Sequence, residues 1–432
     1  MAVLHRAAWM LPIVSPPVRD GWVLVHRGRI VALGGPNDPV PHITAPLGTE
    51  GPRTKGPRTE GLRTRDPRDS GTDGCAILPG LVNAHTHLEL AWMAGLVPPS
   101  DSMGRWIRAL MALRRKEPPP DDVQRQAAAA AVSDARACGT AALGDIGNTL
   151  LTADALADAD MPSVLFHEVI GFGPGDARAR AREGARRVMQ AVRLPVRPGL
   201  APHAPYSVSP DLFRAVADEA AAHRLPSSVH LAESREEVEF LMTGGGEISE
   251  TLKQLGAWND AWSPPGLDPV EYLDRMGVLR PGLLVVHGTQ LSSHAVARLA
   301  DRGCVIVSCP RSNRWVGAGD PPLDAFYASG APVTFGTDSL ASAPDLDLFG
   351  ELAAARALSS VPAAMLLESA TRRGAEALGF GQELGTIEPG KRADLIAVSI
   401  PADVQNVEEY LLTGIPPTDL RWLENDEPDP EP

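Results

Sequence analysis

The sequence predicts an α/β protein built on a (β/α)₈ barrel of the TIM type, with a small β domain formed by both chain termini. From residue 77 onward, apolar runs alternate with amphipathic helical stretches, which is the pattern of parallel βαβ units. Polar residues stand at the ends of many of these runs, and a barrel places its active site at the carboxyl ends of its strands. A doubly wound sheet would gather its site at one switch point. The barrel is therefore the predicted fold.

Apolar runs predict the barrel strands, and Ala/Arg/Leu/Glu-rich stretches between them predict helices. The expected strands are Ile77–Ala84, Ala141–Ile146, Ser163–Ile170, Pro198–Pro202, Ser227–Leu231, Leu283–His287, Val305–Ser308 and Pro332–Phe335. The expected helices include Val123–Ala137, Ala177–Ala191 and Asp211–His223.

The two ends of the chain have a different pattern. Short strand-like pieces at both ends predict residues 1–76 and 379–423 as the small β domain, with residues 77–378 as the barrel. A pentad that begins Gly51-Pro-Arg-Thr-Lys recurs in near-copies, so a disordered insertion is expected at about residues 40–74. The acidic tail, residues 424–432, is also expected to be disordered.

Charge and cysteine content limit the possible partners. The formal net charge is −14, which argues against a nucleic-acid or anionic membrane surface and favours a small-molecule substrate. None of the four cysteines lies in a Cys-x-x-Cys pair, so free thiols are expected. Pro12 and Pro16 interrupt the apolar N-terminal run, which makes a poor signal peptide. We expect a cytoplasmic protein.

Histidines mark the ends of several strands. His85 and His87 are two residues apart, and on a strand such residues point to the same face. His230, His287 and Asp338 end or follow later apolar runs. Two co-directed imidazoles, joined by a third histidine and a carboxylate from other strands, suit Zn²⁺ or Fe²⁺. The sequence predicts a metal-dependent hydrolase.

Five ordered motifs resemble the amidohydrolase superfamily, in its branch of metal-dependent deaminases and chlorohydrolases. The terminal segment Gly385–Leu395 resembles the closing strands of that family. The motifs are Pro79–His87, Ala201–Ser207, His230–Glu233, Val286–Gly288 and Gly336–Ser339.

The resemblance implies one divalent metal, zinc or iron. Its ligands would be His85, His87, His230 and Asp338. Two-metal relatives use a carboxylated lysine or a glutamate in mid-barrel, whereas the fourth strand here ends with His203. A mononuclear site is expected.

Three residues would carry the chemistry. A metal-generated hydroxide attacks a carbon that bears an amino group. Asp338 accepts the water's proton, and Glu233 protonates first the ring nitrogen and then the leaving amine. His287 orients the hydroxide and stabilises the tetrahedral intermediate. The expected enzyme is a hydrolase of carbon–nitrogen bonds other than peptide bonds, and it releases ammonia.

Five further residues are candidates for substrate contact. They are Glu89, His203, Glu168, Asn313 and Ser339. Glu89 follows His87 by two residues, and it either accepts a hydrogen bond from a substrate hydroxyl or anchors its surroundings.

The substrate is expected to be an aminated purine-type nucleoside. The start His85-Thr-His-Leu-Glu89, with Gly104-Arg-Trp-Ile-Arg108, resembles aminodeoxyfutalosine deaminases of menaquinone biosynthesis. These remove the 6-amino group from an adenine nucleoside that carries an aryl carboxylate, and Arg311 or Arg314 could pair with that carboxylate.

Alternatives remain at this stage. The same site could serve a chlorohydrolase or an aminohydrolase of another heterocycle (triazine, guanine, cytosine or S-adenosylhomocysteine), or a cyclic amidase. A non-catalytic metal-binding scaffold is the alternative of another class. A homodimer is possible.

Overall fold

The computed structural model describes residues 2–41, 68–69, 72, 74–116 and 118–423. Most of the expected insertion at about residues 40–74, and all of the tail 424–432, therefore lie outside the described residues. The chain divides into two compact units at Pro79/Gly80, where the sequence predicted a boundary at 76/77. The first unit comprises Met1–Pro79, Thr386–Val407 and Asp419–Pro432, and the second comprises Gly80–Gly385 and Glu408–Thr418.

The first unit contains a seven-stranded sheet that combines both ends of the chain. The strand order is β15-β14-β5-β1-β2-β3, and β4 also pairs with β1. Met10, Val23, Ile77 and Leu395 are buried in its core. The strands are β1 (Val3–Met10), β2 (Val18–His26), β3 (Arg29–Gly34), β4 (Arg68–Asp69), β5 (Cys75–Pro79), β14 (Leu395–Ser399) and β15 (Leu420–Trp422).

The run Ile77–Ala84, predicted as one strand, is two. It is divided between β5 and β6 (Leu81–Thr86), and Gly80 lies between them. Pro79 has a fixed φ and no N–H to donate to a ladder, so it ends a strand readily. A purely apolar pattern does not reveal such a break.

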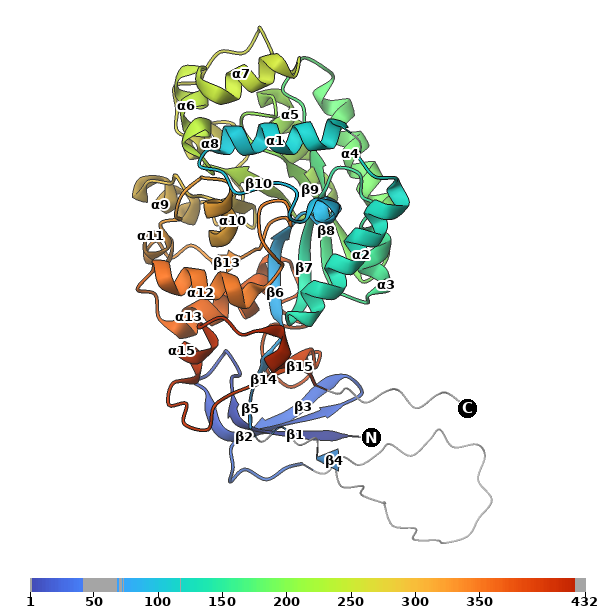
Figure 1. The fold of residues 1–432 in the computed structure, drawn as a ribbon, viewed down its shortest axis with the longest axis vertical. Helices are drawn as coiled ribbons and strands as arrows, with labels where there is room; N and C mark the ends of the chain where they lie inside the picture. The colour runs from blue at the N-terminus through green and yellow to red at the C-terminus, as the bar shows by residue number, and fades with distance from the viewer. Residues whose placement is uncertain (1, 42–67, 70–71, 73, 117, 424–432) are drawn as a thin grey trace, which may run out of the picture. The chain divides into compact units, whose positions relative to one another are not determined.

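The second unit contains two parallel sheets of four strands, which confirms the predicted α/β class (Figure 1). The first sheet has the order β6-β7-β8-β9, and the second has the order β10-β11-β12-β13. Their strands are β7 (Thr140–Gly147), β8 (Ser163–Val169), β9 (Val196–Pro202), β10 (Ser228–Leu231), β11 (Leu284–His287), β12 (Val305–Ser308) and β13 (Val333–Phe335), together with β6.

Single bridges connect these two sheets at both of their outer edges. Leu200 of β9 forms a parallel bridge with Ser227, just before β10, and Thr86 of β6 forms one with Asp338, just after β13. One apolar cluster also joins the sheets, because it contains residues of β6, β7, β8, β9, β11 and β12. The two sheets therefore share one core.

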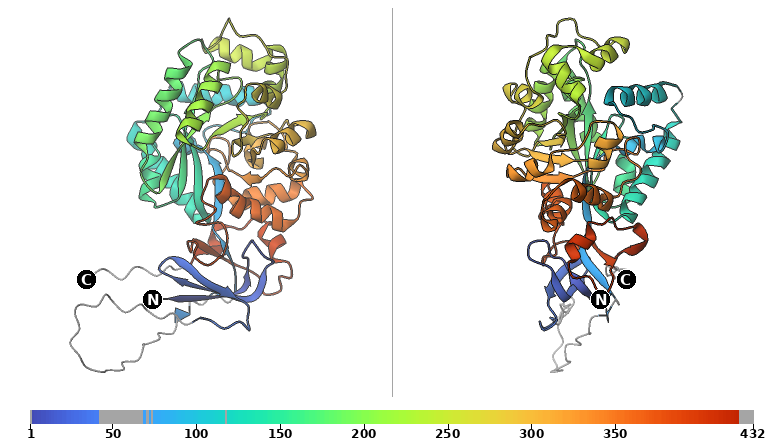
Figure 2. Two further views of the ribbon diagram at one scale, coloured as in Figure 1. Left: turned by 180° about the vertical axis from the view of Figure 1, so that it is seen from behind. Right: turned by 60° about the vertical axis from the view of Figure 1, so that its left-hand side comes forward.

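Helices lie outside the strands in the views of Figures 1 and 2. Helix α4 has the bounds that the sequence predicted, and the Asp176 side chain caps it by accepting from the Ala179 N–H. No helix in the described ranges is long and apolar enough to cross a membrane. The helices are η1 (Leu88–Met93), α1 (Met103–Lys116), α2 (Asp121–Ala137), α3 (Ala153–Asp158), α4 (Ala177–Ala191), α5 (Pro210–His223), α6 (Arg235–Thr243), α7 (Gly246–Gln254), α8 (Pro269–Arg275), α9 (Ser293–Asp301), α10 (Pro310–Trp315), α11 (Leu323–Ala328), α12 (Leu348–Leu358), α13 (Ala363–Glu368), η2 (Ser369–Arg373), α14 (Gly374–Ala377), α15 (Val407–Leu411) and η3 (Pro417–Asp419).

Candidate active site

Four histidines meet at the carboxyl ends of the parallel strands. His85 lies near the end of β6, His230 lies in β10, and His287 is the last residue of β11. The His85 ring centroid is 4.9 Å from that of His87, 5.0 Å from that of His230 and 5.7 Å from that of His287. Four imidazoles at the ends of three strands thus form one cluster, in which His87 alone is partly exposed.

The donor atoms of this cluster fit a divalent metal. Nitrogens of His85, His87 and His230 lie within 4.8 Å of one another, and the Nε2 atoms of His87 and His230 are 3.2 Å apart. Asp338 Oδ1 is 3.5 Å from His85 Nε2 and 3.7 Å from His87 Nε2. Neither ring nitrogen of His85 has a hydrogen-bond partner among the described residues, although both are buried. Three imidazoles and a carboxylate are a donor set that Zn²⁺ and Fe²⁺ accept.

Asp338 presents one carboxylate oxygen to the histidines. Its other oxygen, Oδ2, accepts hydrogen bonds from Ser312 Oγ at 2.6 Å and Ser342 Oγ at 2.9 Å. Burial opposes ionisation of Asp338, but the His85 and His87 side chains outweigh it and hold the pKa well below its usual value. Asp338 is therefore charged at neutral pH, with Oδ1 turned to His85 and His87.

His287 is oriented by an amide. Its Nδ1 lies 2.9 Å from Asn313 Oδ1, so Nδ1 carries the proton and donates it to this oxygen. Its Nε2 is left unprotonated and lies 3.5 Å from Glu233 Oε1. Burial lowers the pKa of His287 to about 4, so the imidazole is neutral at pH 7.

Glu233 stands on a turn that a second glutamate holds. The carboxylate of Glu237 accepts from the N–H of Ala232 at 2.9 Å and from the N–H of Glu233 at 3.0 Å. Burial raises the pKa of Glu233 well above its usual value, and the charge of Asp338 raises it further. Both effects favour the protonated form of Glu233.

Three residues at or beside the cluster have strained backbone. Ala232, His287 and Asp338 have φ values of 52°, 74° and 60°, in the left-handed region that favours glycine. Such conformations cost on the order of 1–3 kcal/mol each and persist where the surroundings impose them. Strained backbone of this kind is common at active sites, which agrees with a functional role for His287 and Asp338.

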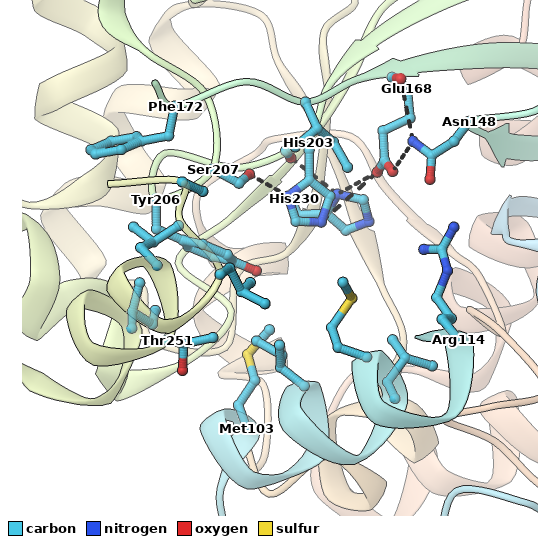
Figure 3. A pocket seen from close by; sticks show the side chains of 18 of the residues that line it. Met103, Arg114, Asn148, Glu168, Phe172, His203, Tyr206, Ser207, His230 and Thr251 are labelled. Atoms are coloured by element: carbon cyan, nitrogen blue, oxygen red, sulfur yellow. Dashed lines mark hydrogen bonds and ion pairs between the residues drawn. The ribbon is translucent and has the colours of Figure 1, made fainter. Parts of the chain in front are cut away.

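A cavity of about 480 Å³ opens onto the cluster (Figure 3). His87, His230, His287, Glu233 and Asp338 line its polar end, and much of the remaining lining is apolar. Its size suits a ligand larger than a free purine base.

Glu168, His203, Glu89 and Ser339, which were expected to touch substrate, all line this cavity. Asn148 Nδ2 donates to Glu168 Oε2 at 2.8 Å, whereas the buried Glu168 Oε1 has no hydrogen-bond partner in the described part of the chain. Glu168 Oε1 lies 3.9 Å from His203 Nε2. Burial raises the pKa of Glu168 to about 7.

Glu89 also has a local structural role. Its Oε2 accepts from the N–H groups of Asn148 and Thr149, each at 3.0 Å, and from Thr149 Oγ1 at 2.7 Å. The side chain thus anchors the loop that positions Asn148 beside Glu168. This contact agrees with the second of the two roles considered for Glu89.

Three expected contacts lie elsewhere. Asn313 is buried beneath His287 and does not line the cavity, because its oxygen is turned to His287 Nδ1. Arg311 and Arg314, considered for pairing with a substrate carboxylate, do not line it either. Arg311 binds Glu351 at 2.7 Å, and Arg314 binds Asp320 at 2.6 Å.

Sequence reasoning assigned no role to Asp145 or Glu237. Asp145 accepts from the Leu88 N–H at 2.8 Å and from Thr86 Oγ1 at 3.2 Å, so it holds the chain on both sides of His87. Glu237 could have been found, because Ser234-x-x-Glu237 is a capping-box pattern at the start of α6. Asp145 offered only its position near the end of an apolar run.

A parallel α/β unit with three histidines and an aspartate at its strand ends defines a metal-dependent hydrolase. Residues 76–415 match the Amidohydrolase family, and the chain belongs to that family.

Two relatives and one solved structure illustrate the similarity. The aminodeoxyfutalosine deaminase of Deinococcus radiodurans is 34% identical over 331 residues, which cover 71% of this chain and 74% of the relative. The 5-methylthioadenosine/S-adenosylhomocysteine deaminase of Syntrophobacter fumaroxidans is 31% identical over 348 residues, covering 77% and 74%. A zinc-bound adenosine deaminase from Xanthomonas campestris matches with a TM-score of 0.77 and 25% identity, covering 97% of this chain and 90% of that one. The chain is a hydrolase that acts on carbon–nitrogen bonds other than peptide bonds.

Proposed function

We propose that this protein is a metal-dependent hydrolytic deaminase of adenine-type nucleosides. The best candidate substrate is 6-amino-6-deoxyfutalosine, whose deamination releases ammonia and would serve menaquinone biosynthesis. The observation that carries the proposal is the placement of Glu233 beside the His/Asp cluster in one cavity, with its Oε1 3.5 Å from His287 Nε2. The deaminase relatives support the same reaction class.

The proposed scaffold is a closed (β/α)₈ barrel, residues 77–378 in the predicted division, with a small β domain from residues 1–76 and 379–423. Bridges at both outer edges of the two four-stranded sheets support closure. The shared apolar cluster supports it as well, because a barrel interior is filled by side chains from many strands.

One divalent metal would be held by His85, His87, His230 and Asp338. When bound, such a metal lowers the pKa of water toward neutrality and supplies a hydroxide nucleophile. These ligand types suit zinc and iron equally.

The chain's own residues would move the protons. Glu233 donates its proton to the ring nitrogen next to the reacting carbon, and the ionised Asp338 accepts the proton of the attacking water. His287 Nε2 accepts a hydrogen bond from that water and orients it. Glu233 takes up the hydroxyl proton of the tetrahedral intermediate and gives it to the departing amine, and the proton held by Asp338 then passes to Glu233, which restores both groups. Water and the amino nucleoside thus become the oxo nucleoside and ammonia.

Substrate contacts are proposed for the cavity-lining residues Glu89, Glu168, His203 and Ser339. Asn313, which lies outside the lining, is proposed as the residue that fixes the His287 tautomer.

A cytoplasmic location is also proposed. All four cysteines are free thiols, and three of them are buried, which suits a reducing compartment. A homodimer remains a prediction, and light scattering would test it.

The test is a substrate panel with metal content measured alongside. Protein loaded with zinc or iron is assayed for ammonia release from 6-amino-6-deoxyfutalosine, S-adenosylhomocysteine, methylthioadenosine, adenosine, guanine, cytosine and an aminotriazine. We expect the highest kcat/KM for the first compound. If metal-loaded protein releases ammonia from no adenine nucleoside, the proposal is wrong.

A further inference from the structure

Helix α1 supplies one wall of the cavity. The lining residues recur every three or four positions, which places them on one face of the helix. Besides Gly104, they are Met103, Trp106, Ile107, Leu110, Met111 and Arg114. All but the last present an apolar side chain, so this wall suits an aromatic or aliphatic group and ends in one guanidinium.

Arg114 has no protein partner among the described residues. No hydrogen bond or ion pair holds its guanidinium, whereas two other arginines of α1 are paired. Arg105 binds Asp101 at 2.9 Å, and Arg108 binds Glu247 at 3.5 Å. Arg180 is the other arginine in the lining, and it is exposed on α4. The half-buried Arg114 is therefore a cation available to a ligand.

Arg114 also lies where a cation stabilises the end of a helix. Arg114, Arg115 and Lys116 form the last turn of α1, where cations interact favourably with the helix dipole. Arg115 and Lys116 are exposed and lie outside the cavity, so they meet that need without Arg114. The direction of Arg114 calls for a separate explanation.

Arg114, Glu168 and His203 line the same cavity. In Figure 3 the guanidinium points from α1 toward the side of the cavity where Asn148 and Glu168 lie.

Hydrogen bonds fix the position of helix α1, and therefore the position from which Arg114 extends. Trp106 Nε1 donates to the carbonyl oxygen of Ala341 at 3.2 Å, and Ser102 Oγ lies 3.1 Å from Glu247 Oε2. A pre-organised group loses less freedom on binding than a mobile one.

We propose that Arg114 is the specificity-determining residue that pairs with a carboxylate at the end of the substrate remote from the reacting ring. This inference rests on the proposed deaminase function. A planar guanidinium binds a carboxylate through two parallel hydrogen bonds. A phosphate dianion fits less well, because Glu89 and Glu168 line the same cavity and two negative charges on the ligand meet more repulsion there than one.

The test compares two substrates that differ in one charge. These are an adenine nucleoside with a 5′-linked benzoate, such as 6-amino-6-deoxyfutalosine, and its methyl ester. We expect Arg114→Ala to lower the acid-to-ester ratio of kcat/KM by about 10- to 100-fold, as expected for loss of a charge-assisted hydrogen-bond pair. Arg114→Lys retains part of the preference. Arg115→Ala is the matched control and leaves the ratio unchanged.

Three outcomes would overturn the inference. They are an equal loss of kcat/KM for acid and ester in Arg114→Ala, the same shift of the ratio in Arg115→Ala, and a preference of the wild type for adenosine 5′-monophosphate over the benzoate. Arg114→Gln supplies the ratio if the alanine variant does not fold, as judged by circular dichroism and metal content. No ammonia from either substrate with wild-type protein would instead refute the deaminase proposal.

Discussion

The two ends of the cavity differ in how their polar groups are held. At the histidine end, Ser312 and Ser342 fix Asp338, and Asn313 fixes His287. At the α1 end, the wall is apolar, and the guanidinium of Arg114 has no partner among the described residues. On the proposed function, Asp338 and His287 act at the reacting atoms, and hydrogen bonds fix both side chains. Arg114 would select the ligand, and its guanidinium is free to bind one.

Loss of a metal ligand should have the largest effect at the histidine end. We expect His230→Ala to lower bound metal below one ion per chain and to reduce ammonia release by more than about 1000-fold, because hydroxide at neutral pH depends on the metal. Metal analysis and a coupled ammonia assay measure both effects. His223→Ala, an exposed histidine on α5, is the control and should retain metal and activity. Full activity of metal-free His230→Ala would show that the cluster is structural.

Removal of the proton donor should have the next largest effect. Glu233→Gln is expected to lower kcat/KM by about 10²- to 10⁴-fold with metal content unchanged. Because the pKa of Glu233 is raised, the proton that it donates is lost only as pH rises through that raised pKa. The wild-type rate should therefore fall on the alkaline side, and the variant should lack that limb. Glu239→Gln, an exposed neighbour on α6, serves as the control. Unchanged turnover in Glu233→Gln would exclude the proton-shuttle role.

Removal of the Asn313 amide should lower activity less than removal of His230 or Glu233. Asn313→Leu removes the acceptor of the His287 Nδ1 proton and should lower kcat by about 10- to 100-fold. Asn313→Asp keeps an acceptor oxygen and should recover much of the rate. Equal activity of the leucine and aspartate variants would show that the His287 tautomer is not set by residue 313.

The turn-holding carboxylate should affect stability more than chemistry. Glu237→Gln loses one of two backbone hydrogen bonds at a fully buried site, at a cost of about 1–3 kcal/mol. Burial raises the pKa of Glu237 from 4.5 to about 7, so the native wild type holds a proton that the unfolded chain releases. Wild-type stability therefore falls as pH rises across this interval, and the gap between the two proteins should narrow. Urea unfolding at several pH values measures that gap, and a gap that widens with pH would contradict the assignment.

The sequence predicted the histidine end of the cavity but not the α1 end. Strand ends are marked locally, because an apolar run that stops at His85, His230 or His287 shows both the strand and its terminal side chain. The face of α1 that meets the cavity depends on distant contacts such as Trp106 with Ala341. Periodicity gave no reason to separate Arg114 from Arg115.

Smaller discrepancies have the same origin. The break at Pro79 occurs where consecutive strands belong to different sheets, and an apolar pattern carries no sheet assignment. Arg311 is near the site in sequence, but Glu351 from α12 binds it, and that pairing is fixed only by the fold. Ser234 and Glu237 show a capping-box pattern in the sequence, but the hydrogen bonds from Ala232 and Glu233 to Glu237 depend on how the chain folds around that turn.

Isotope transfer from solvent water tests hydrolytic deamination itself. Metal-loaded wild-type protein is given 6-amino-6-deoxyfutalosine in H₂¹⁸O, and the product and ammonia are both quantified. A hydrolytic deaminase should place one ¹⁸O atom at carbon 6 of the purine ring for each ammonia released. Release of ammonia without the label in the product, or turnover that leaves the 6-amino group in place, would show that the protein is not a hydrolytic deaminase of this nucleoside.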